Sequence, residues 1–421
     1  MKVLVIGNGA REHALVVKIA RSPHVDAIYA LPGNAGTAGI AHNIALSLSE
    51  IPAIIQKAQE LKVGLVVVGP EAPLAAGITD MFNQTGISVF GPSGSAARLE
   101  SSKSFARQLM VAHGIPCAAG REFTVYAEAK SYLEKQHAPI VVKADGLAAG
   151  KGVTVANTLE EAMSALDAIM KARVFGAAGD RVIIEECLAG REVSLLAFTD
   201  GNTVIPMVPA CDYKRVFDGD AGPNTGGMGS YSPPGFFDEE MVKQVTATII
   251  KPVINAMSTQ GSVYKGVLYT GLIMTPSGPK VLEFNARFGD PETQAILPRL
   301  ETDLVDIMLA SVNGTLDKIK IDWSKDACVG VVLASGGYPG EYQTGHVIGV
   351  TDKLEQGVNI FYAGAKKRAD GRVMTDGGRV LTVAATGKTL KAARDKVYRN
   401  IQHVNFEGMH YRTDIAAREV N

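Results

Sequence analysis

The segment VLEFNARFGDPETQ at residues 281–294 carries the residue types and the spacing best suited to chemistry. Glu283 and Asn285 alternate with apolar residues, so both would face one side of a β-strand. A carboxylate and an amide oxygen suit Mg²⁺, which usually binds one or two protein groups and completes its shell with phosphates and water. Arg287 continues this face and can bind a phosphate or a carboxylate. The turn that follows would place Asp290 and Glu292 at the mouth of the site. The alternative is a polar strand face that is simply exposed to water.

A second candidate is the segment VVKADGLAAGKG at residues 141–152. A predicted strand delivers Lys143, and a loop of small residues follows it with Gly150, Lys151 and Gly152 near its end. The backbone amides and the two ammonium groups of such a loop can close over a polyphosphate. A solvated turn beside a surface lysine is the alternative.

The segment IIEECLAGREVS at 183–194 offers a third candidate, in which a predicted strand ends in acidic residues. The backbone at a strand end can hydrogen bond the edge of a purine, and a later carboxylate can accept both ribose hydroxyls. Paired surface acids are common, so this segment indicates a nucleotide only in combination with the others. The residues concerned are Glu185, Glu186, Leu188 and Glu192.

The segment GNGAREH at 7–13 places glycines between a predicted strand and a predicted helix. The first amides of such a helix point at an anion, and we expect Gly9 and Arg11 to bind one phosphate. A dinucleotide is disfavoured because Glu12 stands where the fingerprint G-x-G-x-x-G/A requires a small residue. The alternative is that the glycines only make a tight turn.

Two further segments fit the same cleft, ACDYKRV at 210–216 and GPNTGGMGSYSP at 222–233. The second is rich in glycine and could fold over a substrate as a closing loop. Either segment could equally be a surface excursion. The candidate residues are Asp212 and Lys214 in the first segment and Gly226, Gly227 and Met228 in the second.

The elements that must position these residues begin as alternating strands and helices. Strand-like runs at 2–6, 27–31, 65–70 and 87–91 are separated by helical periodicity, which predicts a parallel sheet with helices on both faces. A helix at 101–114 would follow as a hinge, because Ser precedes it and Gly and Pro end it.

The rest of the sequence, after the hinge helix, predicts smaller α+β units. We therefore expect a multidomain protein of the α/β and α+β classes. Strands at 139–144 and 181–187 enclose a helix at 158–170, and the strands 266–275 and 278–286 form a hairpin. After residue 327 short strands and one helix, at 388–402, are expected. The predicted division is 1–100 for the N-terminal domain, 101–122 for the hinge, 123–192 and 193–326 for two lobes, and 327–421 for a small C-terminal domain rich in strands.

Composition argues against several classes of function. The 421 residues carry 42 Lys and Arg and 43 Asp and Glu, a net charge of −1 without long runs of either sign, so a nucleic-acid or membrane-surface partner is disfavoured. No apolar stretch is long enough to cross a bilayer, and no cleavable leader is apparent. The four cysteines show no CxxC spacing, which favours free thiols. We expect a cytoplasmic protein whose protein partners are left open.

Taken together, these segments resemble a known family. Over about residues 101–326, the chain resembles the nucleotide site of the ATP-grasp superfamily. The residues that carry this resemblance are Lys103, Lys143, the 145–152 loop, Glu185 to Glu192, and Glu283 with Asn285. From end to end the chain resembles the phosphoribosylamine–glycine ligases through GNGAREHAL, VVGPEAPL, VVKADGLAAGKGV, GPNTGGMGSYSP and EFNARFGDPETQ.

The resemblance implies a two-lobed ATP-grasp core that uses ATP with Mg²⁺ or Mn²⁺, glycine and 5-phosphoribosylamine. Glycyl phosphate would be the intermediate, and ADP, phosphate and glycinamide ribonucleotide the products. Lys103, Lys143 and Arg287 would neutralise the triphosphate, with Glu283 and Asn285 as metal ligands. Many ATP-grasp enzymes take a second metal carboxylate from the preceding strand, which here reads LYTGL and supplies none. Asp212 is a possible substitute. The implied catalytic residues are Asp212, Lys214, Arg287 and Asp290.

The sequence also permits three other functions. A dehydrogenase could use residues 1–100, but it would leave 281–294 without a role. A non-catalytic ATP-binding regulator would bind MgATP without amino-acid-dependent release of ADP. A ligase for another acid and amine would use the same ATP chemistry.

Overall fold

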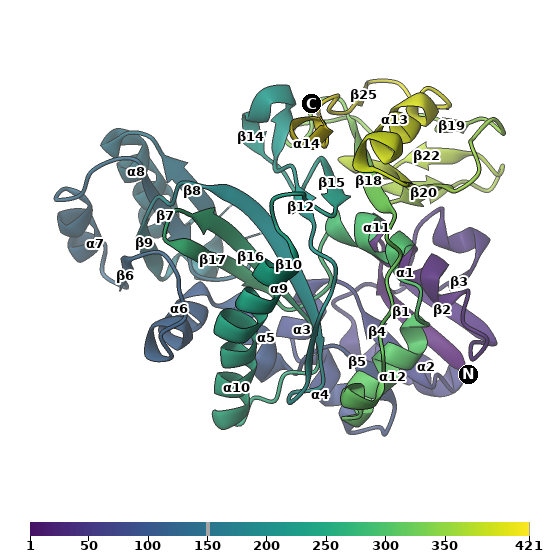
Figure 1. Cartoon of the computed structure of the whole chain (residues 1–421), viewed down its shortest axis with the longest axis horizontal. Helices are drawn as coiled ribbons and strands as arrows, with labels where there is room; N and C mark the ends of the chain where they lie inside the picture. The colour runs from purple at the N-terminus through teal and green to yellow at the C-terminus, as the bar shows by residue number, and fades with distance from the viewer. Residues whose placement is uncertain (149–151, 421) are drawn as a thin grey trace.

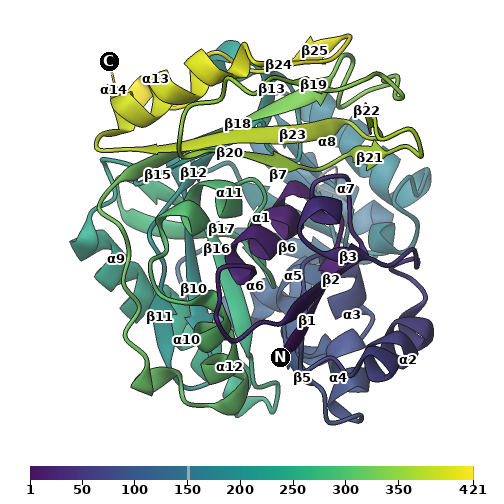
Figure 2. The same cartoon turned by 90° about the vertical axis from the view of Figure 1, so that its right-hand side faces the viewer.

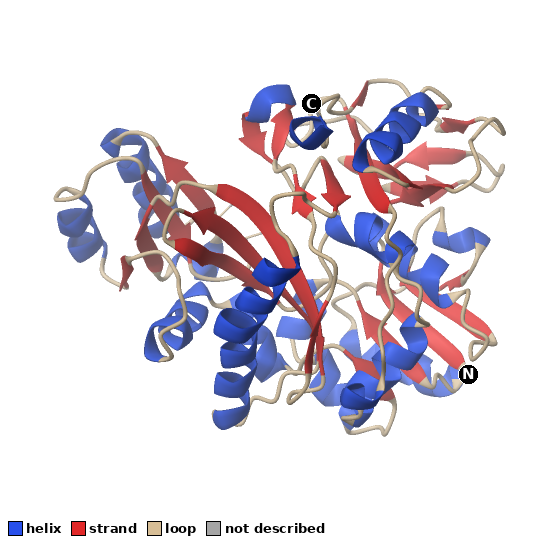
Figure 3. Ribbon diagram, viewed as in Figure 1, coloured by secondary structure: helices blue, strands red, loops and turns tan. Residues whose placement is uncertain are grey.

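The computed structural model describes residues 1–148 and 152–420. Four main sheets are arranged around a common centre, with the small lobe at the left of Figure 1, the N-terminal sheet at the right and the C-terminal sheet above it. Figure 3 shows that helices cover the outer faces of these sheets. In the described ranges, no helix combines the length and the apolar character that a membrane crossing requires.

The N-terminal sheet is parallel with the strand order β3-β2-β1-β4-β5, as the alternating pattern predicted. Its strands are β1 (Lys2–Gly7), β2 (Ala27–Pro32), β3 (His42–Asn43), β4 (Leu65–Val68) and β5 (Ser88–Phe90). Its helices are α1 (Ala10–Ile19), α2 (Ile51–Leu61), α3 (Glu71–Ala75) and α4 (Ile78–Asn83). The central strands β1 and β4 are buried on both faces, which is typical of parallel sheets.

Two helices lead out of this domain, α5 (Gly94–Ser101) and α6 (Lys103–Ala112). The helix predicted at 101–114 is therefore confirmed as α6, but it begins at Lys103. Its cap is Ser102, whose Oγ accepts a hydrogen bond from the Phe105 amide at 3.2 Å. Such a cap satisfies one of the amides that have no partner in the first turn of a helix.

The small lobe is an antiparallel sheet of order β6-β9-β7-β8 with two helices packed on it. The predicted strand–loop–helix–strand order is confirmed, although the helix expected at 158–170 changes to a π-helical turn over Asp167–Lys171. The elements are β6 (Gly120–Phe123), α7 (Tyr126–Leu133), β7 (Ile140–Ala144), β8 (Val153–Ala156), α8 (Leu159–Leu166) and β9 (Val182–Glu186).

The large lobe is built on an antiparallel sheet of order β11-β10-β16-β17. The predicted hairpin is confirmed, with Thr275 opposite Gly278, and a register shift after Gly271 leaves Leu282 without a partner in the ladder. The strands are β10 (Arg191–Thr199), β11 (Val204–Pro206), β16 (Gly266–Thr275) and β17 (Gly278–Asn285). The helices are α9 (Glu239–Val245), α10 (Lys251–Thr259), α11 (Glu292–Ile296) and α12 (Leu304–Asn313).

The C-terminal sheet has the order β12-β15-β18-β23-β20, with β25 paired to β18 at one end, and Figure 2 shows it with α13 lying across it. The short strands expected here are only partly right, because β18 and β23 have nine residues each. Its elements are β18 (Ala327–Ser335), β20 (Val358–Tyr362), β23 (Arg379–Gly387), α13 (Leu390–Ile401) and β25 (Met409–His410). Smaller elements are β19 (Gly349–Val350), β21 (Ala365–Lys367), β22 (Val373–Thr375), β24 (Val404–Asn405) and α14 (Ala417–Val420).

The glycine-rich segment at 219–235 is not a single loop. It contains β14 (Ala221–Asn224), which forms a hairpin with β13 (Arg215–Phe217), and β15 (Gly229–Ser232). β15 and β12 (Cys211–Asp212) pair with each other, and β15 also pairs with β18 of the C-terminal sheet. The segment 211–232, from the middle of the sequence, thus joins the large lobe to the C-terminal sheet.

Candidate active site

A cavity of about 980 Å³ lies where the four sheets approach one another. Most residues that were predicted from sequence line it, although they come from distant segments. They are Gly9, Arg11, Lys103, Lys143, Gly152, Glu185, Glu186, Leu188, Glu192, Asp212, Lys214, Gly226, Glu283, Asn285, Arg287 and Asp290. Gly150 and Lys151 lie outside the described residues.

The strand β17 presents its polar side chains to this cavity. Glu283 and Asn285 are partly exposed and line it, while Val281 and Phe284 are buried. The alternation expected from sequence fails at Leu282, which is partly exposed and lines the cavity instead of facing the core. The register shift at that residue places the side chains of Val281 and Glu283 differently from a regular strand.

Cations surround the Glu283 carboxylate. The Lys214 ammonium lies 3.7 Å from it and 3.2 Å from a carboxylate oxygen of Glu192. Burial acts to raise the pKa of Glu283, but Lys214 and the two lysines Lys143 and Lys103 hold that pKa below its ordinary value. The carboxylate is therefore ionised at neutral pH.

The donor set at this point fits a magnesium ion. Glu283 supplies a charged oxygen and Asn285 an amide oxygen, and the latter accepts one long hydrogen bond, from Arg287 at 3.3 Å. The two residues offer too few ligands to complete a shell alone. Mg²⁺ typically takes its remaining ligands from substrate phosphates and water.

The part of the cavity that lies between the small and the large lobe is called the deep end. It is lined by basic and apolar side chains from both lobes. Lys143 Nζ lies 2.5 Å from a carboxylate oxygen of Glu185, which also pairs with Arg107 at 3.3 Å. Lys103 Nζ donates to the Gly146 carbonyl at 2.9 Å, and burial lowers the pKa of Lys103. The apolar lining comes from Val141, Val155, Val281 and Phe284. The Lys103–Gly146 contact joins the hinge helix to the loop predicted to bind phosphate.

The acidic segment after β9 is already partnered. Glu186 accepts hydrogen bonds from the Ala119 amide at 2.8 Å and from Lys280 at 3.1 Å. Glu192 is bonded to Lys214 as described. Their side chains are thus held in place, while the chain at Cys187 and Leu188 lines the cavity.

At the end of the cavity that the N-terminal domain forms, the loop after β1 is bonded to the carboxylate of Glu12. The Gly9 amide donates to Glu12 at 2.7 Å, and the Arg11 guanidinium lies 2.5 Å from the same carboxylate and 3.2 Å from the Phe288 carbonyl. A Cβ on Gly69 would lie 2.0 Å from Glu12, so the carboxylate fills the space that small residues leave. The Gly9 amide is thus already bonded to Glu12, and the phosphate site near Gly9 and Arg11 stays a prediction. The amides after it, at the start of α1, have no partner within the helix.

Arg287 is fixed by two carboxylates that sequence reasoning missed. Its guanidinium lies 2.8 Å from Glu71 and 2.9 Å from Glu100, and Glu100 also accepts from the Ala286 amide at 2.7 Å. Glu71 belongs to the segment VVGPEAPL, whose only signal was the family resemblance. Glu100 gave no signal, because nothing local distinguishes it from a surface acid.

Asp290 is bonded to the C-terminal sheet, which also was not predicted. One carboxylate oxygen accepts from Arg379 at 2.7 Å and the other from Gln294 at 2.8 Å. Burial acts to raise the pKa of Asp290, but Arg379 and Arg11 hold it below its ordinary value.

The glycine-rich loop contributes fewer residues than expected. Asn224, Thr225 and Gly226 line the cavity, whereas Gly227 and Met228 do not. The Met228 side chain is 0% exposed and packs against the C-terminal sheet, so the structure does not bring this side chain to the cavity, and a substrate contact of Met228 stays a prediction. Residues that follow it belong to β15, which explains its burial.

Asp212, two residues before Lys214 in the chain, is a half-buried acid that lines the cavity. Burial raises the pKa of Asp212 to about 8, while Lys214 opposes that rise. Glu292, expected at the mouth of the site, is only 2% exposed, and its carboxylate accepts from Tyr269 at 3.0 Å and from Ser194 at 3.1 Å. These bonds hold the Glu292 carboxylate in a fixed position in the wall of the cavity.

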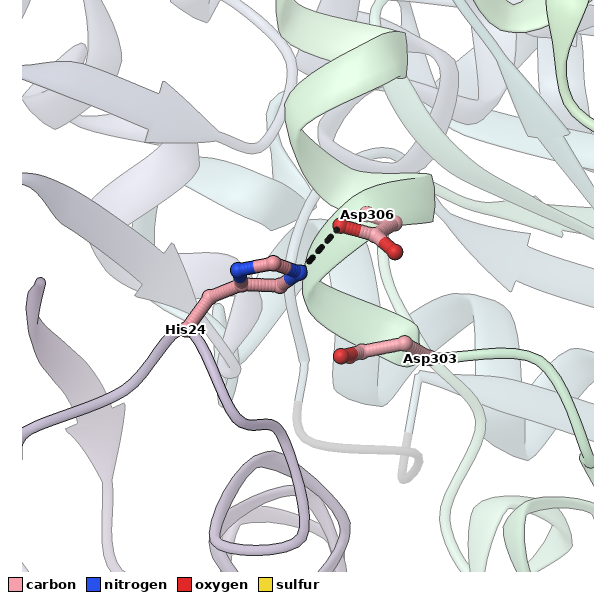
Figure 4. Close-up of side chains that lie close together, drawn as sticks. All are labelled: His24, Asp303 and Asp306. Carbon is pink, nitrogen blue, oxygen red and sulfur yellow. Dashed lines mark ion pairs between the residues drawn. The ribbon is translucent and has the colours of Figure 1, made fainter.

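A separate group of potential metal ligands lies outside this cavity (Figure 4). His24 is 3.4 Å from Asp306 at the surface, and Asp303 caps α12 by accepting from the Val305 amide at 2.8 Å. These local roles account for the cluster, so it carries no metal assignment.

Comparisons with known proteins agree along the whole chain. The N domain of phosphoribosylglycinamide synthetase matches residues 1–100, its ATP-grasp (A) domain 101–293 and its C domain 328–418. The phosphoribosylamine–glycine ligase of Caldanaerobacter subterraneus subsp. tengcongensis is 48% identical over 99% of this chain and 100% of its own. That of Salmonella typhimurium is 47% identical over 100% of this chain and 99% of its own.

Solved structures give the same relationship. The phosphoribosylamine–glycine ligase of Thermotoga maritima superposes with a TM-score of 0.87 at 33% identity and covers 99% of this chain and 100% of its own. A biotin carboxylase of Campylobacter jejuni, at 16% identity and a TM-score of 0.76 over 99% of this chain and 98% of its own, shares the fold alone. The fold, the sequence relationship and the cavity together show that the chain belongs to the phosphoribosylglycinamide synthetase family of ATP-grasp ligases.

Proposed function

We propose that the cavity joins glycine to 5-phosphoribosylamine at the expense of ATP, through a glycyl phosphate, to give glycinamide ribonucleotide, ADP and phosphate. The observation that carries this assignment is β17, where Glu283 and Asn285 face the cavity with Lys103, Lys143 and Lys214 around them. The names of the relatives supply the identity of the acid and the amine.

The deep end suits the nucleotide. Apolar side chains of both lobes can cover the two faces of the adenine, and Lys103 and Lys143 can neutralise the phosphates. Glu185 holds the Lys143 ammonium in position at 2.5 Å. When bound at Glu283 and Asn285, Mg²⁺ or Mn²⁺ would shield the charge of the phosphate oxygens.

In the first step, a carboxylate oxygen of glycine attacks the γ-phosphorus and ADP leaves. Charge builds on the transferring group, so its stabilisation by Lys214 and the neighbouring lysines lowers the barrier. In the second step, the amine of phosphoribosylamine attacks the carbonyl carbon of glycyl phosphate, and phosphate leaves as the amide forms. Enclosure by four sheets limits access of water to the acyl phosphate.

The N-terminal end suits phosphoribosylamine. Its 5′-phosphate would take the unpaired amides at the start of α1, beside Arg11. We also propose a cytoplasmic location and no nucleic-acid partner, which the four free cysteines and the net charge of −1 support.

The replacement Glu283→Gln tests the assignment. It keeps one carbonyl oxygen and removes the charge, so folding should persist while turnover falls by about 10² or more, equivalent to roughly 2.7 kcal/mol. Excess Mg²⁺ should restore part of the activity. Stabilisation of the protein by MgADP should also weaken. A variant with normal melting temperature and near-normal glycine-dependent ADP formation would show that this carboxylate is structural.

A further inference from the structure

Three parts of the chain meet at the Asp290 carboxylate. Asp290 itself follows β17 of the large lobe, and a Cβ placed on Gly9 of the N-terminal domain would lie 3.9 Å from its Oδ2. Arg379, the first residue of β23 in the C-terminal sheet, donates to the same oxygen at 2.7 Å. Gln294 holds the other oxygen, so the carboxylate has one defined orientation.

Arg379 makes a second contact, to the glycine-rich loop. Its Nη1 donates to the Gly226 carbonyl at 2.5 Å, and the Gly226 amide donates to the Tyr338 hydroxyl at 3.0 Å. A Cβ on Gly226 would lie 2.9 Å from the guanidinium carbon, so a glycine is needed for this approach. Both polar groups of the Gly226 backbone are thus bonded to residues of the C-terminal domain, Arg379 of β23 and Tyr338 of the turn after β18.

The residues of this bridge are distinct from those at the deep end of the cavity. Arg379, Tyr338, Gly226 and Asp290 all line the cavity, and the Arg379 side chain remains 23% exposed. The lysines at the deep end, by contrast, are bonded to Glu185 and Gly146 of the small lobe. A change at Arg379 should therefore act on one end of the cavity.

We propose that Arg379 is a positioning residue, through which the C-terminal sheet holds Asp290 and the 224–227 loop where glycine and phosphoribosylamine bind. The inference rests on the proposed function, because it assigns the two ends of the cavity to different substrates. Asp290 held in this way presents a carboxylate beside the Gly9 loop, where it can accept a hydrogen bond from a substrate amine. The guanidinium spans two acceptors, which a lysine cannot do with the same geometry.

The test compares steady-state kinetics of Arg379→Ala, Arg379→Lys and Tyr338→Phe with the unmodified protein. For Arg379→Ala we expect kcat/KM for glycine and for phosphoribosylamine to fall by about tenfold or more, because a charge-assisted contact to each of two groups is lost. The KM for ATP and the thermal stabilisation by MgADP should change by less than about twofold. Arg379→Lys should recover part of the loss, and Tyr338→Phe should show a smaller loss with the same substrate pattern.

Chemical rescue gives a readout that a purely structural role would not move. Guanidinium at a non-denaturing concentration should raise the activity of Arg379→Ala and leave that of Arg372→Met unchanged. Arg372 is a matched control, since it belongs to the same domain but pairs with Asp370 at the surface.

Equal losses in the kinetics of ATP and of the other two substrates would overturn the proposal, as would unchanged kinetics in Arg379→Ala. If that variant does not fold, the substrate pattern of Arg379→Lys and Tyr338→Phe decides in the same way. Failure of the proposed function is distinguishable, because the unmodified protein would then release no ADP in response to glycine and phosphoribosylamine.

Discussion

The Lys214 ammonium lies 3.7 Å from the carboxylate of Glu283, the residue proposed to bind the metal. A lysine so close to a metal ligand competes with the metal for the same negative charge. A carboxylate oxygen of Glu192 lies 3.2 Å from the same ammonium, so two carboxylates share this lysine. Lys214 thus compensates in the free protein for a charge that a divalent cation would also compensate.

This competition gives the first prediction. Lys214→Met should lower the melting temperature in the absence of metal, because the Glu192 and Glu283 carboxylates lose their common counter-ion. Millimolar Mg²⁺ alone should then raise the melting temperature of Lys214→Met more than that of the unmodified protein, since binding to the folded state stabilises it. Differential scanning fluorimetry with and without Mg²⁺ measures both effects.

Lys280→Met is the matched control for that experiment. Lys280 lies on β17, the strand that carries Glu283. It pairs with Glu186 at 3.1 Å, but neither Lys280 nor Glu186 is a proposed metal ligand. Its response to Mg²⁺ should equal that of the unmodified protein. Equal responses of all three proteins would contradict the metal assignment at Glu283.

A second prediction concerns Arg11 at the N-terminal end of the cavity. Arg11→Ala removes the partner of Glu12 and the bond to the Phe288 carbonyl, so the loop after β1 loses its link to the large lobe. The KM for phosphoribosylamine should rise by about tenfold or more, while the KM for ATP stays nearly unchanged. Initial rates with each substrate varied in turn measure this. A loss confined to ATP would place the phosphate of phosphoribosylamine elsewhere.

The third prediction is a pH dependence of stability that arises at His13. Burial lowers the pKa of His13 to about 4, and its Nδ1 accepts a hydrogen bond from the Tyr362 amide at 2.9 Å. The unfolded chain, with a pKa near 6.5, binds a proton that the folded protein excludes. The stabilising effect of the neutral ring is therefore complete above about pH 6.5 and is lost as the pH falls toward about 4.

His13→Asn isolates this contribution, because the amide oxygen of Asn can accept the same hydrogen bond without titrating. Between about pH 7.5 and pH 5 the unmodified protein should lose about 2 kcal/mol more unfolding free energy than His13→Asn. Urea unfolding at both pH values measures the difference. Parallel losses in the two proteins would mean that His13 is protonated in the folded state.

Local sequence pattern was enough to place the strand that carries the proposed metal ligands. Glu283 and Asn285 are separated by one buried aromatic residue, and two-residue periodicity determines which face each side chain takes. The Pro-Ser-Gly turn set the hairpin, and Ser102 with Gly114 delimited the hinge helix. The parallel N-terminal sheet followed for the same reason, because its strands and helices alternate regularly.

Contacts between distant segments could not be predicted in this way. Arg379 of the C-terminal sheet bonds to Asp290, which follows β17 of the large lobe, although the two residues are 89 positions apart in the sequence. Glu100 meets Arg287 across the domain boundary. Each of these residues is an ordinary surface type locally, so the fold alone gives it a place in the cavity.

Transfer of labelled oxygen tests the central claim most directly. The unmodified protein is supplied with MgATP, phosphoribosylamine and glycine whose carboxylate carries heavy oxygen, and the released phosphate is analysed by mass spectrometry. If glycyl phosphate forms, one glycine oxygen bridges carbon and phosphorus and leaves with the phosphate, so each phosphate should carry one heavy oxygen. Phosphate without label, released together with glycinamide ribonucleotide, would contradict the account.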